Sequence, residues 1–372
     1  MDEPHPHIFF AEPPPEEAKG GIDLAMRTIE LYLDRTDLSL TRKASLKDIK
    51  SVTGPCLVHF HGLWQITHGW MGRWCRAHDI PYVVSPHGML EPWAWAHKKW
   101  KKWPYYLLVE RRHLQGAGRV LATSDLEAQN LAEFVPADQV HTIPLALTED
   151  VGPNCAAARA QRGWPSDETV LVYLSRLHEK KGMHELLKGV AALPAEQTES
   201  LRLVVVGDGP SEYRERLRRI EDEHNEQLPR IDWEGAVWGE EKWTYLQGAD
   251  LFCLPTHSEN FGLVVLEACQ VGTPVLTTPG TPWQFLEDWN SGLIAEPDPE
   301  SLRSALDTYL SSFGWTTEDR HRLAGRTRDR FGLSTVGPQY VDLYQTVVQE
   351  PSRRAGRVGD SSARMERDLG LE

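Results

Sequence analysis

The sequence lacks several features that would each point to a class of protein. No apolar run in its 372 residues approaches the roughly 20 residues that a membrane-spanning helix needs. The amino terminus has neither the basic start nor the apolar stretch of a signal peptide, so we expect a cytoplasmic protein, with the inner face of the membrane as a peripheral location. The five cysteines are scattered, without the close pairs typical of zinc or redox sites: Cys56, Cys75, Cys155, Cys253 and Cys269.

Positive charge is also scarce. The 40 lysine and arginine residues are outnumbered by 54 aspartate and glutamate residues, which gives a formal net charge of −14. Proteins that bind nucleic acid in general need a basic face, so this balance argues against one. No Asp-x-Asp motif occurs, and we therefore expect neither a metal ion bridging a diphosphate nor another cofactor. Any anionic ligand must be met by local positive charge.

Short apolar segments alternate with helical stretches along most of the chain. Candidate strands cover residues 57–61, 82–85, 120–123, 170–174, 203–206, 251–254 and 275–277. Strands spaced by helices are typical of parallel α/β layers, which bind ligands beyond the carboxyl ends of the strands. Residues 124–127 form a capping-box pattern, Ser-Asp-Leu-Glu, which predicts a helix to about Phe134. The stretch 34–55 shows no convincing strand, so we expect the first sheet to lack a member.

A chain of this length is expected to form two domains. The alternating pattern lapses between Thr148 and Ser166, so we place an amino-terminal domain at 1–150 and a second domain at 151–335. A helix is predicted over 336–350, where it can pack back on the amino-terminal domain. Residues 351–372 are polar and charged without periodicity, and we expect them to be disordered.

The strongest pattern in the second half covers residues 257–274. It follows a candidate strand and becomes helical from Phe261 onward, so backbone amides at a helix start are predicted to offer an anion site. Gly262 would let a phosphate approach closely. Glu259 precedes this helix and Glu267 lies about two turns into it. Two carboxylates on either side of an anion site suit a sugar and a ribose.

Basic residues gather after the candidate strand at 170–174. Arg176, Lys180 and Lys181 follow it in one loop, where a diphosphate would find its counter-charges. A glycine turn, Gly-Asp-Gly-Pro, stands at 207–210. A dinucleotide-binding motif would need a third glycine where Glu212 stands, which argues against a dehydrogenase.

Several motifs resemble, in order, those of the retaining GT-B glycosyltransferases of family 4, the glycosyl transferases group 1. They are Arg-Leu-His-Glu-Lys-Lys-Gly at 176–182, Val-Gly-Asp-Gly-Pro at 206–210, and the pair of Glu259 and Glu267. The resemblance implies two Rossmann-like parallel-sheet domains that face each other across a cleft, with a nucleotide-diphosphate sugar as co-substrate. Ser175 departs from the family, which usually has glycine there.

The resemblance also implies roles for single residues. Arg176 and Lys181 would hold the donor diphosphate, Glu259 would face the sugar, and Glu267 would meet the ribose. His87, in Ser-Pro-His-Gly, resembles the family histidine near the reacting sugar. The catalytic residues so implied are His87, Glu259, Arg176 and Lys181. The donor-binding residues so implied are Gly20, Gly21, Arg176, Lys181, Glu259, Phe261, Gly262, Leu263 and Glu267.

The acceptor is predicted to meet the first half of the chain. Residues 94–113 interleave basic residues with Trp and Tyr, which suits an anionic membrane surface or a sugar acceptor; a solvated helix face with tryptophans turned to the core is the alternative. His61 is a further candidate, with a packed histidine as its alternative. The predicted acceptor or membrane face comprises His61, Lys98, Lys99, Lys101 and Lys102. The stretch 59–127 also resembles a bacterial subgroup that builds surface polysaccharides.

The predicted function is therefore retaining transfer of a sugar from a nucleotide-diphosphate sugar to a glycan or lipid-linked acceptor, in cell-surface polysaccharide or glycolipid synthesis. The first half offers no obvious carboxylate nucleophile for a double displacement, so attack on the same face is favoured. Residues 143–147, Ile-Pro-Leu-Ala-Leu, depart from the Pro-Asn-Gly-like turn of the family. A sugar-nucleotide epimerase of the same fold and an inactive sugar-nucleotide-binding scaffold remain the alternatives.

Overall fold

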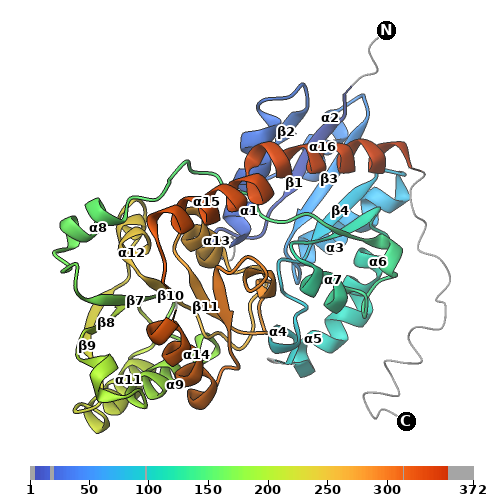
Figure 1. Ribbon diagram of the computed structural model, residues 1–372. Coiled ribbons are helices and arrows are strands. Elements are labelled where there is room, and N and C mark those ends of the chain that lie inside the picture. Colours follow the sequence, from blue (N-terminus) through green and yellow to red (C-terminus); the bar gives the residue numbers. More distant parts are fainter. Residues whose placement is uncertain (1–4, 17–20, 97–98, 313, 351–372) are drawn as a thin grey trace. The chain divides into compact units, whose positions relative to one another are not determined.

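The computed structural model describes residues 5–16, 21–96, 99–312 and 314–350. Gly20, Lys98 and the tail predicted over 351–372 lie outside these residues. The chain divides into two compact units (Figure 1). The first unit comprises Met1–Thr148 and Leu333–Glu372, and the second comprises Glu149–Gly332. Among the described residues, no helix combines the length and apolar character needed to cross a membrane.

A six-stranded parallel sheet forms the centre of the first unit, in the order β2-β1-β3-β4-β5-β6. Its strands are β1 (His7–Ala11), β2 (Ser39–Thr41), β3 (Cys56–His61), β4 (Tyr82–Ser85), β5 (Arg119–Ala122) and β6 (Val140–Thr142). Its helices are α1 (Gly21–Leu33), α2 (Leu46–Ser51), α3 (Ile66–Ala77), α4 (Pro92–Ala96), α5 (Lys99–Tyr105), the π-helix η1 (Tyr106–Glu110), α6 (Arg111–Gln115), α7 (Asp125–Leu131), η2 (Ala137–Gln139) and α16 (Leu333–Gln349).

The prediction that this sheet lacks a member was wrong. The strand β2 lies in the stretch 34–55 and pairs in parallel with β1, with Ser39 opposite His7. It has three residues and sits at the edge of the sheet, with a half-exposed burial pattern. An edge strand of this length leaves no apolar run for a pattern search to find.

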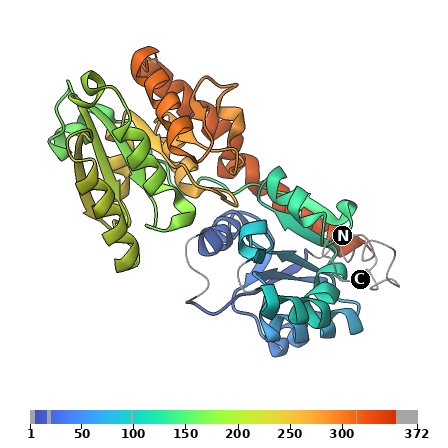
Figure 2. The same ribbon diagram turned by 90° about the horizontal axis from the view of Figure 1, so that it is seen from below.

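The inner strands β1, β3, β4 and β5 of the first unit are buried on both faces because alternate residues enter two separate cores. Ile8 and Phe10 of β1 pack with helices α1 and α16, whereas Phe9 and Ala11 pack on the opposite side of the sheet. Side chains along a strand alternate in direction, so a strand covered on both sides must be apolar throughout. Figures 1 and 2 show helices on both faces of this sheet.

The last helix, α16, belongs to the first unit although it follows the second unit in sequence. It lies beside α1 (Figure 1), and Gly337 permits this because a Cβ there would overlap the ring of Tyr32, at 2.0 Å. The hydroxyl of Tyr344 lies 2.8 Å from Nδ1 of His59 on β3. The helix thus completes the core of the first unit.

The second unit also has a six-stranded parallel sheet, in the order β12-β11-β10-β7-β8-β9. Its strands are β7 (Thr169–Leu174), β8 (Leu201–Val206), β9 (Arg230–Gly235), β10 (Leu251–Cys253), β11 (Val275–Thr277) and β12 (Gly292–Ile294). Its helices are α8 (Cys155–Arg162), η3 (Glu179–Lys181), α9 (Met183–Ala191), α10 (Ala195–Thr198), α11 (Ser211–Glu223), α12 (Glu241–Gly248), α13 (Leu263–Gln270), η4 (Gln284–Leu286), α14 (Pro299–Ser312) and α15 (Thr317–Phe331).

Three strands lie in sequence on one side, β7, β8 and β9, and three on the other, β10, β11 and β12. This is the strand order of a doubly wound nucleotide-binding sheet. The predicted α/β class with two Rossmann-like units is therefore confirmed.

Candidate active site

The predicted donor-binding residues of the second unit gather at one end of its sheet. The chain reaches the edge strand β9 and then returns to β10, which pairs with the opposite side of β7. Open α/β sheets bind ligands beyond the carboxyl ends of such a strand pair. Arg176 and Lys181 follow β7, while Glu259 follows β10. The topology therefore brings all three residues to the ligand-binding end of the sheet.

The loops after β7 and β10 touch each other through Gly182. Its φ is +70°, and a Cβ at this position would lie 1.9 Å from the carbonyl oxygen of Pro255. Only glycine allows this approach in this conformation. The carbonyl oxygen of Lys180 accepts two further hydrogen bonds from the second loop, from the amide of His257 at 2.8 Å and from the hydroxyl of Thr256 at 2.9 Å. The two loops thus form one continuous wall.

Lys181 and Glu259 form an ion pair within this wall. The ammonium group of Lys181 donates to Oε2 of Glu259, and the two side chains are only 12% and 18% exposed. The amide of Glu259 donates to the carbonyl oxygen of Gly280 at 2.9 Å, and this hydrogen bond anchors the loop after β10. We predicted separate roles for the two charges, one toward phosphate and one toward sugar. The structure instead pairs them with each other, so any anion that binds the ammonium group of Lys181 would compete with Glu259.

Arg176 differs from Lys181 in being exposed. Its carbonyl oxygen accepts a hydrogen bond from the hydroxyl of Tyr173 at 3.2 Å, which anchors its backbone. Within the described part of the chain, no residue forms an ion pair with its guanidinium group. A planar guanidinium group without a protein partner is suited to a bidentate contact with phosphate oxygens.

The helix α13 begins directly after Gly262, whose φ of +80° favours glycine. The neighbouring Phe261 is buried, and its ring packs against Trp283 and Phe331. The indole nitrogen of Trp283 also donates to the carbonyl oxygen of Phe261. These contacts fix the start of the helix, where Leu263 is the first helical residue and the helix dipole favours an anion.

Glu267 on α13 pairs with a residue that the sequence did not reveal. The ammonium group of Lys242, on α12, lies 2.8 Å from Oε1 of Glu267. Burial raises the pKa of the Glu267 carboxyl above its usual value, and the positive charge of Lys242 opposes that rise. Glu149 adds a smaller upward contribution to this pKa. The sequence could not predict that Lys242 pairs with Glu267, because α12 lies before the segment 257–274 and carries no recognisable motif.

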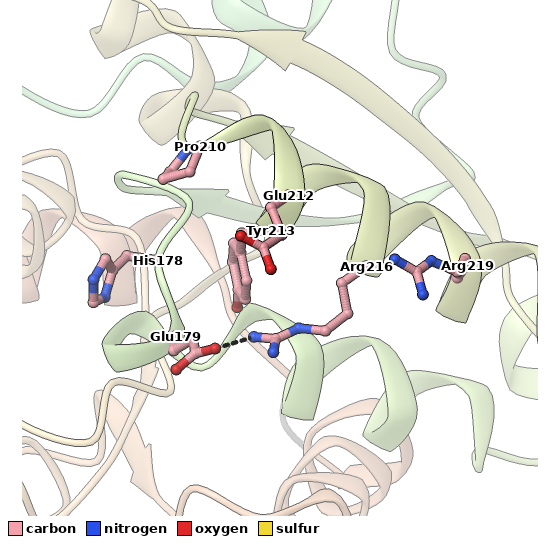
Figure 3. A pocket seen from close by; sticks show the side chains of 7 residues that line it. All are labelled: His178, Glu179, Pro210, Glu212, Tyr213, Arg216 and Arg219. Carbon is pink, nitrogen blue, oxygen red and sulfur yellow. Dashed lines mark hydrogen bonds and ion pairs between the residues drawn. The ribbon is translucent and has the colours of Figure 1, made fainter.

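A pocket of about 430 Å³ lies beside this wall (Figure 3). It is formed by the loop after β7 and the start of α11, and Arg216 spans it to reach Glu179 at 2.6 Å. Its lining residues are His178, Glu179, Pro210, Glu212, Tyr213, Arg216 and Arg219. Lys181, Glu259 and Glu267 are not among these lining residues. The pocket is therefore next to the predicted donor site and is not the donor site itself.

In the first unit, His61 and His87 meet at the carboxyl ends of β3 and β4. Nδ1 of His61 and Nε2 of His87 lie 3.1 Å apart, and the two rings are stacked within 15°. Burial lowers the pKa of His87 to about 4. His87 also has a φ of +52°, a conformation that is uncommon outside glycine and that often marks functional loops. Both imidazoles are therefore neutral near pH 7, and His61 is fully buried.

Glu127 holds the strained turn that carries His87. Its carboxylate accepts from the amides of Gly88 and Thr123, both at 2.7 Å, and from the hydroxyl of Thr123 at 2.9 Å. Burial raises the pKa of Glu127 to about 7. The capping prediction is confirmed for Ser124, which accepts from the amide of Glu127 at 3.1 Å. The predicted extent of the helix was wrong, since α7 ends at Leu131.

The remaining predicted residues that are described belong to α1 and α5 of the first unit. Gly21 is the exposed first residue of α1. Lys101 is exposed, whereas the ammonium group of Lys102 donates to the carbonyl oxygen of Ala94 at 2.5 Å. The side chain of Lys99 lies outside the described residues. Within the residues that are described, no cluster of three or more His, Cys, Asp or Glu side chains is arranged to hold a metal ion.

Comparison with known proteins covers both units. Residues 156–330 match the family described as glycosyl transferases group 1, and residues 39–146 match the family described as glycosyl transferase 4-like domain. The chain is also similar to a D-inositol 3-phosphate glycosyltransferase of Kineococcus radiotolerans. The two are 28% identical over 328 residues, which span 81% of this chain and 73% of that protein.

Solved structures share the fold at lower identity. A sucrose-phosphate synthase from Thermosynechococcus elongatus superposes with a TM-score of 0.74 at 21% identity, over 92% of this chain and 99% of that one. HepE of Anabaena, solved in complex with UDP-glucose, superposes with a TM-score of 0.69 at 17% identity, over 91% of this chain and 99% of that one. These similarities assign the GT-B type of fold to both units.

Proposed function

We propose that this glycosyltransferase, whose residues 156–330 match the family of glycosyl transferases group 1, transfers a sugar with retention from a nucleotide-diphosphate sugar to a glycan or lipid-linked acceptor. We further propose that the product serves cell-surface polysaccharide or glycolipid synthesis. One observation supports the donor most strongly. Lys181 and Glu259 form a shielded pair at the ligand-binding end of the second sheet, and the same loop carries Arg176, whose guanidinium group has no ion-pair partner among the described residues.

In the proposed reaction, positive charge stabilises the leaving diphosphate. Arg176, Lys181 and the start of α13 supply this charge without a metal ion, and donors already in place stabilise a developing anion best. The bond from the anomeric carbon to the phosphate oxygen breaks, and a bond to the acceptor oxygen forms on the same face. The proton of the acceptor hydroxyl passes to the leaving phosphate oxygen, so charge and atoms balance.

The first test is substitution of the shielded pair. Lys181→Ala and Glu259→Ala should each lower turnover by at least about 100-fold, as removal of one transition-state charge contact commonly does. Lys188→Ala is the matched control, because Lys188 is an exposed lysine on α9 of the same unit. Nucleotide release in the presence of acceptor measures turnover. Near-normal turnover in both site variants would refute the proposed site.

The second test identifies the donor and separates the alternatives. UDP-, GDP- and ADP-sugars are screened by thermal shift, since a ligand that binds the folded state raises the unfolding temperature. An epimerase would release nucleotide without any acceptor, and an inactive scaffold would bind the donor without turnover. Because one relative is named for an inositol phosphate acceptor, D-inositol 3-phosphate belongs in the acceptor panel beside lipid-linked glycans. The anomeric configuration of the product, read by NMR, tests retention.

A further inference from the structure

Exposed apolar side chains are concentrated on one part of the first unit. Among the described residues, seven large hydrophobic side chains are exposed, and six of them come from α3, α4, α5 and η1. Trp70, Trp100 and Leu108 are 71%, 74% and 73% exposed. The six are Ile66, Trp70, Trp93, Trp100, Leu107 and Leu108, which we call the apolar face. Apolar residues clustered on a surface commonly mark a site of interaction.

The helix α3 exposes two large apolar side chains, Ile66 and Trp70. Ile66, Trp70 and Arg73 follow one another at helical spacing and are all exposed, while His68 and Cys75 of the same helix are buried. A helix at the surface of a soluble unit normally turns a polar stripe outward. Of the five exposed residues of α3, Ile66 and Trp70 are large and apolar, Arg73 is a cation, and the other two are Thr67 and Ala77.

The π-helix η1 packs directly against α3. A Cβ at Gly69 would lie 2.4 Å from Cγ1 of Val109, so this glycine lets η1 approach closely. Leu107 and Leu108 precede Val109 and are exposed, whereas Tyr106 and Glu110 of the same turn are buried. Short π-helical turns are rare and frequently occur at functional sites. The exposed residues of α3 and η1 therefore flank one shared contact.

The charge of this region is opposite to that of the whole protein. The helices α3, α4, α5, η1 and α6 together contain a single acidic residue, Glu110, which is fully buried. Exposed cations from the same helices are Arg73, Lys101 and Arg112. The whole protein has a net charge of −14, but these five successive helices expose no acidic side chain. An anionic partner therefore meets less electrostatic repulsion here than on the rest of the protein.

We propose that the apolar face, with Arg73, Lys101 and Arg112, binds the surface of an anionic phospholipid bilayer. Tryptophan and leucine side chains enter the interface between headgroups and acyl chains, and the cations meet lipid phosphates. The contact differs from a lysine-only patch, since Lys102 is turned toward Ala94 and the apolar residues of α3 and η1 carry the binding. This proposal is linked to the proposed function in one respect: membrane binding would bring the enzyme to a lipid-linked acceptor.

Co-sedimentation with vesicles tests the contact on the full chain. Vesicles of zwitterionic phospholipid alone are compared with vesicles that contain equal parts of zwitterionic and anionic phospholipid. The wild-type chain should sediment with the anionic vesicles and far less with the zwitterionic ones. Burying one large apolar side chain in the bilayer raises the water-to-vesicle partition coefficient at least about tenfold. The double variant Trp70→Ser, Leu108→Ser should therefore lower this coefficient by about 100-fold. Both side chains are exposed, so folding is not at stake.

Trp238→Ser is the matched control, because Trp238 is the seventh exposed hydrophobic residue and belongs to the second unit. It should sediment like the wild type. Unchanged sedimentation of the double variant, or no binding of the wild type to anionic vesicles, would overturn the proposal. A wild-type dimer that the double variant loses, without vesicle binding, would assign the face to a second copy and also overturn it. Donor turnover, measured on the same samples, reports on the proposed function separately.

Discussion

A buried carboxyl group in the first unit makes its stability depend on pH. Glu110 is fully buried on η1, and its Oε1 accepts from the amide of Trp64 at 2.7 Å. Its other oxygen, Oε2, has no hydrogen-bond partner among the described residues. Burial raises the pKa of Glu110 from its usual value of 4.5 to about 7. The neutral acid is therefore the form that the folded chain favours.

The sign of the effect follows from this rise. Below the unfolded pKa both states are protonated, and the contribution is fully present. As pH rises through 4.5 and toward 7, the unfolded chain loses its proton first, and stability falls until the folded carboxyl also ionises. Each unit of pKa is worth about 1.4 kcal/mol, so the whole loss is about 3.5 kcal/mol, most of it between about pH 4.5 and about pH 7.

Glu110→Gln tests this reasoning. The amide keeps an oxygen for the Trp64 N–H but cannot ionise, so the variant should gain about 2 kcal/mol relative to the wild type between about pH 5 and about pH 8.5. Urea unfolding followed by circular dichroism at both pH values gives the free energies. Glu133→Gln, at an exposed position of the same unit, is the control and should show no such gain. A difference between Glu110→Gln and wild type that is independent of pH would refute the reasoning.

Most of the fold could be predicted from the sequence because buried parallel strands are continuous apolar runs. Each of the seven candidate strands corresponds to an observed strand of the two sheets. The strands β2, β6, β9 and β12 were missed, and all four lie at sheet edges. Edge strands are short or half-exposed, so their residues carry little apolar signal. The central strand β1 was missed as well, since its five residues stand close to Pro6 and Pro13.

The candidate site could be predicted only as far as it rests on local motifs. The loops that carry Lys181 and Glu259 each have a recognisable pattern, and the structure brings them together. The pairing of these two charges was not predictable, because it depends on the approach of Gly182 to Pro255 across two loops. The same holds for Glu127, which was assigned to a helix cap and whose carboxylate also secures the turn after His87. Partners from separate elements become visible only in three dimensions.

Two further substitutions test the geometry of the second unit. Lys242→Met removes the cation beside Glu267, raises the pKa of that buried carboxyl further, and should weaken donor binding at least about tenfold in calorimetry; unchanged affinity would contradict this role. Gly182→Ala and Gly163→Ala separate backbone strain from steric overlap, because both positions have positive φ but only Gly182 would place a Cβ against Pro255. Strain alone should cost Gly163→Ala about 1 kcal/mol in the free energy of unfolding, and overlap should bring the cost for Gly182→Ala to about 3 kcal/mol or more. Urea unfolding measures both, and equal losses would mean that the loops after β7 and β10 do not meet as closely as Gly182 indicates.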